Sequence, residues 1–104
     1  MASPLTKDII LAKLSANKAQ LSEFGVREIG LFGSYARNQA TTKSDIDLLV
    51  DISKDKKTLR NYLTIVYFLE DLFSKKVELI TKQSLSKHIG PHILDTIEYV
   101  ARNE

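Results

Sequence analysis

Two aspartates, Asp45 and Asp47, have the residue type and spacing to bind metal ions. They begin an apolar run up to Asp51 that has the composition of a β-strand, and alternate side chains of a strand lie on one face. Alternate Cα atoms lie roughly 6–7 Å apart, so the two charges repel by on the order of 2–3 kcal/mol at an effective dielectric constant of about 20. Two Mg²⁺ ions that bridge the carboxylates and a nucleotide phosphate would offset this repulsion. A solvated acidic edge is the alternative interpretation of the pair.

Upstream of this pair, Gly33-Ser34 has the properties of a phosphate-binding turn. Glycine has no Cβ, so a phosphate can approach the backbone closely. Ser34 is expected at the N-cap of a short helix, whose free N–H groups and macrodipole favour anions. Arg37 lies one helical turn further on and can bind phosphate oxygens with its guanidinium group. Each feature is common alone, and the prediction of a nucleotide site depends on their combination with the aspartate pair on the next strand.

These segments resemble the nucleotidyltransferase superfamily of the DNA polymerase β type, and more narrowly the minimal nucleotidyltransferase (MNT) antitoxins of HEPN–MNT toxin–antitoxin pairs. The resemblance is carried by Gly33-Ser34-Tyr35-Ala36-Arg37 and Ser44-Asp45-Ile46-Asp47-Leu48-Leu49-Val50. The chain length and the order of elements also fit, so we expect residues 1–104 to form a single minimal nucleotidyltransferase domain. Asn38 replaces a glycine that the family usually has, and asparagine tolerates the left-handed backbone conformation of such a turn.

The resemblance also implies a third carboxylate. Members of the superfamily often have an acidic residue, usually Asp, in the middle of a later strand, where it completes the metal site or helps to deprotonate the attacking hydroxyl. Glu78 occupies this context, and its side chain is one methylene longer than that of Asp. We therefore expect Glu78 to act with Asp45 and Asp47 as a catalytic and metal-binding residue. A surface or ion-paired role is the alternative for Glu78.

The reaction implied by the resemblance is Mg²⁺-dependent transfer of AMP from ATP. The ATP phosphates are expected at Gly33, Ser34 and Arg37, and the two metal ions at the three carboxylates. The implied acceptor is a tyrosine hydroxyl of a partner HEPN ribonuclease toxin, which adenylylation would neutralise. Two alternatives stay open, namely a non-catalytic antitoxin that acts by stoichiometric binding, and a nucleotidyltransferase that modifies a small molecule such as an aminoglycoside.

An α/β (α+β) fold, with a small, mixed, twisted sheet and packed helices, is expected to position these residues. Apolar runs predict strands at Val26–Phe32, Ser44–Asp51 and Lys75–Thr81, and Asp51 is assigned a structural role at the strand end. Helical spacing predicts a first helix that starts at Ser3-Pro4, breaks near Ser15-Ala16-Asn17, and ends at Gly25. A second helix is predicted over Leu59–Phe73, and a last one from Gly90-Pro91 with Ile97 and Val100 on its packing side.

Composition limits the function classes. With 43% hydrophobic and 27% charged residues, the chain has the composition of an ordinary globular domain. A net charge of +2 gives no electrostatic case for direct nucleic-acid binding. The lack of cysteine excludes disulfides and thiolate metal sites and fits a cytoplasmic protein. We expect no membrane contact, because the N-terminus has no signal-peptide pattern and the longest apolar-rich run, 63–69, is too short to span a bilayer.

Overall fold

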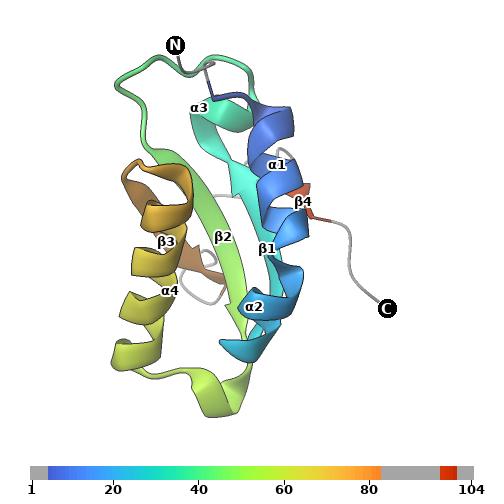
Figure 1. Cartoon of the computed structure of the whole chain (residues 1–104), viewed down its shortest axis with the longest axis vertical. Coiled ribbons are helices and arrows are strands. Elements are labelled where there is room, and N and C mark those ends of the chain that lie inside the picture. Colours follow the sequence, from blue (N-terminus) through green and yellow to red (C-terminus); the bar gives the residue numbers. More distant parts are fainter. Residues whose placement is uncertain (1–4, 83–96, 101–104) are drawn as a thin grey trace.

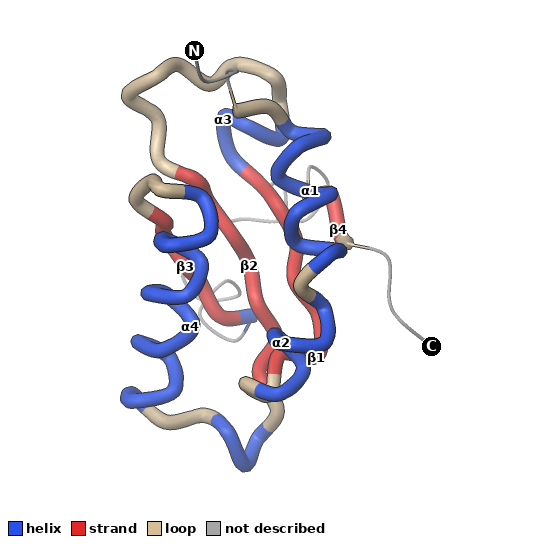
Figure 2. Tube along the Cα trace, viewed as in Figure 1, coloured by secondary structure: helices blue, strands red, loops and turns tan. Residues whose placement is uncertain are grey.

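The computed structural model describes residues 5–82 and 97–100. In this part of the chain, a four-stranded mixed sheet has the strand order β3-β2-β1-β4. Strand β1 is antiparallel to both β2 and β4, whereas β2 and β3 are parallel. Helices cover one face of this sheet (Figures 1 and 2). The predicted mixed α/β architecture is confirmed, with strands at Val26–Phe32 (β1), Ile46–Ile52 (β2), Val77–Thr81 (β3) and Glu98–Tyr99 (β4).

The N-terminal helical region is broken where the sequence predicts. Helix α1 is Lys7–Ala16 and helix α2 is Lys18–Glu23. Asn17 lies between them, and its side-chain amide donates a hydrogen bond of 2.8 Å to the Lys13 carbonyl oxygen. The predicted start is wrong, because the N-cap is Thr6, whose hydroxyl accepts a hydrogen bond from the Ile9 N–H at 3.2 Å. Ser3 and Pro4 lie outside the described residues.

Helix α4, Leu59–Phe73, has the predicted bounds and connects the two parallel strands β2 and β3. A parallel pair of strands needs such a crossover connection. A short 3₁₀ turn at Lys54–Lys56 precedes the helix, and its N-cap is Thr58. Helix α4 is followed by its C-cap Ser74, which has a left-handed backbone conformation with φ of 50°. None of the described helices has both the length and the apolar character needed to cross a membrane.

Strand β2 is buried on both faces, as its apolar run predicts. Leu48, Leu49 and Val50 are 0%, 1% and 0% exposed. Leu48 and Val50 belong to the main core between the sheet and the helices, whereas Leu49 packs with Phe32 in a separate cluster. The two acidic side chains of β2, Asp47 and Asp51, are therefore half-buried among buried apolar residues.

The predicted C-terminal helix is wrong at its described end. Residues 90–96 of that prediction lie outside the described residues, but Glu98–Tyr99 forms strand β4 and pairs with β1 at Gly30 and Leu31. Gly30 permits this pairing, because a Cβ there would lie 2.5 Å from Ile97 Cγ2. Val100, which is buried in the main core, follows the period of a strand rather than of a helix.

Candidate active site

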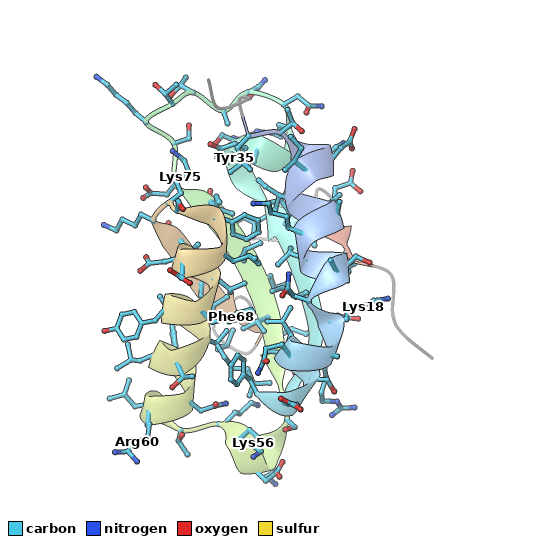
Figure 3. All side chains as sticks on the ribbon, in the orientation of Figure 1. Lys18, Tyr35, Lys56, Arg60, Phe68 and Lys75 are labelled. Carbon is cyan, nitrogen blue, oxygen red and sulfur yellow. The ribbon has the colours of Figure 1, made fainter. Side chains whose placement is uncertain are left out.

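The site contains a row of three paired residues, one from each of three adjacent strands. Strand β1 ends at Phe32, which pairs with Asp47 of β2, and Asp47 in turn pairs with Glu78 of the parallel strand β3. Because β2 and β3 are parallel and β1 is antiparallel to β2, this row lies where β1 ends and the other two begin. Helix α3, Gly33–Ala36, follows β1 at the same end of the molecule (Figure 1). Tyr35 and Lys75 mark this end in the side-chain view (Figure 3).

Asp47 has an unusually acidic environment. Burial, a hydrogen bond with Glu78, the charge of Glu78 and the charge of Asp45 raise its pKa from 3.8 to about 6, in that order of importance. Arg37 acts in the opposite direction and does not balance them. The structure therefore brings Asp47 and Glu78 into contact, and places Asp45 and Arg37 close enough to act on the Asp47 carboxyl.

Gly33 packs directly against Asp47. Its φ of +77° is in the left-handed region that favours glycine. A Cβ at this position would overlap the Asp47 carboxylate and lie 2.9 Å from its Cγ. The absence of a side chain at Gly33 is thus what leaves room for the carboxylate at the turn after β1.

The prediction that Ser34 caps the short helix is wrong. Strand β1 runs directly into α3, so Phe32 is the N-cap and Gly33 is already the first helical residue. Ser34 lies one position further on, half-buried, and its carbonyl oxygen accepts a hydrogen bond from the Gln39 N–H at 2.8 Å. The expected left-handed conformation of Asn38 is confirmed, with φ of 57°.

Sequence reasoning missed the contacts that hold the loop before β2. The Lys75 ammonium group donates a hydrogen bond of 2.9 Å to the Thr42 carbonyl oxygen, and the Ile46 N–H donates one of 3.1 Å to the Lys76 carbonyl oxygen. Strand β2 begins at Ile46 rather than at Ser44, so Asp45 lies in this tethered loop. Charge and spacing carried no signal for these contacts, because they join residues far apart in the sequence.

The side chains of the site have the donor chemistry that Mg²⁺ prefers, since carboxylate oxygens are its usual protein ligands. Burial and then the neighbouring Glu78 and Asp45 raise the pKa of Asp47. The negative charge of these neighbours also favours a cation at the site. Within residues 5–82 and 97–100, however, no three acidic, histidine or cysteine side chains already form a closed ligand cluster. The residues fit the metal in their chemistry, while the expected joint role of Asp45, Asp47 and Glu78 stays a prediction.

The raised pKa of Asp47 predicts that the contribution of this residue to the stability of the metal-free protein falls as the pH rises from about 4 to about 6. In this range the folded state binds the proton more tightly than the unfolded chain, where the ordinary value of 3.8 applies, so unfolding becomes easier as the proton leaves. Asp47→Asn removes this effect. We expect its gain in Tm over the wild type to be smallest near pH 4 and largest above about pH 6. A gain that is constant across thermal unfolding curves from about pH 4 to 8 would contradict the prediction.

Comparison with known proteins identifies the family. Residues 14–101 match the model of the nucleotidyltransferase domain. The chain is 41% identical over 97 residues to the protein adenylyltransferase MntA of Thermococcus cleftensis, and the match covers 92% of this chain and 97% of that protein.

Two solved structures have a similar fold. A minimal nucleotidyltransferase superposes with a TM-score of 0.73 at 23% identity, over 97% of this chain and all of that one. The MNT antitoxin complex with the tri-AMPylated HEPN toxin of Shewanella oneidensis gives a TM-score of 0.64 at 18% identity, over 94% of this chain and 74% of that one. From the family model and the MntA homologue, this chain belongs to the nucleotidyltransferase domain family and is a transferase homologous to the protein adenylyltransferases.

Proposed function

We propose that this protein transfers AMP from ATP to a tyrosine hydroxyl of a partner HEPN ribonuclease toxin and thereby neutralises it. The observation that carries the proposal is the contact between Asp47 and Glu78 directly beside Gly33. Asp47 packs against the Gly33 turn, and Glu78 contacts Asp47 from the neighbouring strand. The name of the MntA homologue and the AMPylated toxin in the similar complex support the same reaction and the same class of partner.

The residues of the site divide between the nucleotide and the acceptor. The ATP phosphates lie along the backbone at Gly33 and Ser34, and Arg37 donates to their oxygens. The acceptor hydroxyl attacks the α-phosphorus in line, a new oxygen–phosphorus bond forms, and the bond to the β-phosphate breaks. Pyrophosphate leaves, and Glu78 takes the hydroxyl proton. The products are an AMP-tyrosine and pyrophosphate.

Mg²⁺ fits this arrangement, and Asp45, Asp47 and Glu78 are the residues that would hold two such ions. When bound, these ions supply charge stabilisation for the attacking and leaving oxygens. The protein supplies the carboxylates. In the absence of the ions, it holds the pKa of Asp47 at about 6. We further propose that residues 1–104 act as a single domain in the cytoplasm, where ATP is available.

Intact-mass measurement of the toxin tests the proposal. A candidate HEPN-type partner toxin is incubated with the purified protein, ATP and Mg²⁺, next to an Asp45→Asn/Asp47→Asn control. We expect a mass gain of one or more AMP units that is absent from the control and from a sample treated with a metal chelator. Suppression of toxicity without any mass gain would instead favour a binding-only antitoxin, and turnover without a protein acceptor would favour a small-molecule substrate.

A further inference from the structure

Two side chains of α4 hydrogen-bond the backbone on either side of Glu78. The Glu70 carboxylate accepts a hydrogen bond from the Val77 N–H, with Oε2 and N 3.1 Å apart. The Tyr62 hydroxyl donates a hydrogen bond to the carbonyl oxygen of Leu79. Both contacts are partly buried, where a hydrogen bond is stronger than in water. Glu78 is the single residue between these two anchored positions.

The two contacts lie along the outer edge of β3. In the described part of the sheet, β3 is the edge strand and pairs with β2 alone. Backbone groups of alternate residues point to the same side of a strand, so those of Val77 and Leu79 share one edge. An edge strand otherwise presents unpaired N–H and C=O groups there. Strand β3 is therefore held by β2 on one side and by α4 on the other.

The position of Glu78 depends on this double attachment. Glu78 lies opposite Asp47 only while β3 keeps its register with β2, because a slip of one residue turns every side chain to the other face. Displacement by about 1 Å is enough to cost on the order of 100-fold in a preorganised site. Tyr62 is also near the Glu78 carboxylate, since burial and then the charge of Glu78 raise the pKa of Tyr62.

We infer that Tyr62 and Glu70 are positioning residues that hold Glu78 beside Asp47 through the backbone of β3. The inference rests on the proposed function for the role of Glu78 in catalysis. The hydrogen bonds of both residues are made to the backbone of β3 and not to a carboxylate of the site. Each fixes one neighbour of Glu78, so that the backbone of β3 keeps Glu78 in register with Asp47.

The test uses matched variants of α4. Tyr62→Phe and Glu70→Ala remove one hydrogen bond each. As controls, Tyr67→Phe and Asp71→Ala change a tyrosine and an acidic residue at exposed positions of the same helix. Mn²⁺ affinity, measured by electron paramagnetic resonance, is the first readout, because it needs no acceptor. We expect a loss of about tenfold for the first two variants, as for residues that support metal ligands, and less than about twofold for the controls. Glu70→Gln keeps an acceptor oxygen and should restore most of the affinity.

AMP transfer is the second readout. Tyr62→Phe and Glu70→Ala should lower kcat by about tenfold with little change in the KM for ATP. In the Glu78→Gln background they should cause no further loss, because residues that act through one another are not additive. An equal loss with and without Glu78 would show a general effect on folding and overturn the inference, as would variants that behave like their controls.

The two proposals fail in different ways. Wild-type protein that binds Mn²⁺ with the expected pattern of variants, yet transfers no AMP, refutes the proposed function and retains the positioning role. If the wild-type protein transfers AMP and Tyr62→Phe and Glu70→Ala match their controls, the proposed function is supported and the positioning role is refuted. Wild-type protein that neither binds Mn²⁺ nor transfers AMP overturns both.

Discussion

Asp47→Asn is expected to lower kcat for AMP transfer by on the order of 10³-fold while the protein stays folded. Asp47 is the central residue of the row, paired with Phe32 on one side and Glu78 on the other. Loss of its charge removes several kcal/mol of the stabilisation that bound metal gives to the transition state, at about 1.4 kcal/mol for each factor of ten. Pyrophosphate release and the intact mass of the toxin measure the effect.

The stability of the same variant separates a functional from a structural role. Because the pKa of Asp47 is raised to about 6, its ionised form weakens the folded state at neutral pH, and Asp47→Asn should have a Tm equal to or above that of the wild type. Asp51→Asn is the matched control, since Asp51 lies four residues further along the same face of β2 and is likewise half-buried. Comparable loss of activity in both variants would refute a special role for Asp47.

Gly33→Ala is expected to reduce AMP transfer by at least about 100-fold, because the new Cβ must displace the Asp47 carboxylate. A non-glycine residue in the left-handed region also costs about 1–2 kcal/mol of stability. Urea unfolding and the rate of pyrophosphate release measure the two effects separately. The activity loss should greatly exceed what the fraction of unfolded protein explains.

Gly25→Ala is the control for backbone strain. Gly25 has a similar φ of +86°, and a Cβ there would also clash, but with Lys56 Cβ at 2.5 Å and Ser53 Oγ at 2.9 Å instead of with a carboxylate of the site. Lys56 lies at the opposite end of the molecule from Tyr35 of α3 (Figure 3). Gly25→Ala should therefore lose a similar amount of stability and keep its activity. If both variants lose activity in proportion to their stability, the proposed role of Gly33 is wrong.

Much of the fold could be predicted because its patterns are local. The apolar runs of β1 and β2 and the helical stripe of α4 each identify an element from neighbouring residues. The helix ends were less predictable. Ser34 and Thr6 both have side chains suited to an N-cap, but Thr6 caps α1 whereas Ser34 does not cap α3, because the course of the chain decides where each helix begins. The prediction of a C-terminal helix failed because the apolar residues of 97–100 fit the period of a helix as well as that of a strand. Pairing with the edge of β1 beside Gly30 decides for the strand.

The sequence by itself determined the residue types of the site: the Asp45–Asp47 pair, the Gly33 turn and an acidic residue in β3. Only the tertiary structure decided that Asp47 and Glu78 touch, because the parallel pairing of β2 and β3 depends on the packing of α4 across the sheet. It also decided that Asp47 becomes less acidic, since a pKa depends on burial and on charges from other strands. These effects come from residues distant in the chain, and no local pattern encodes them.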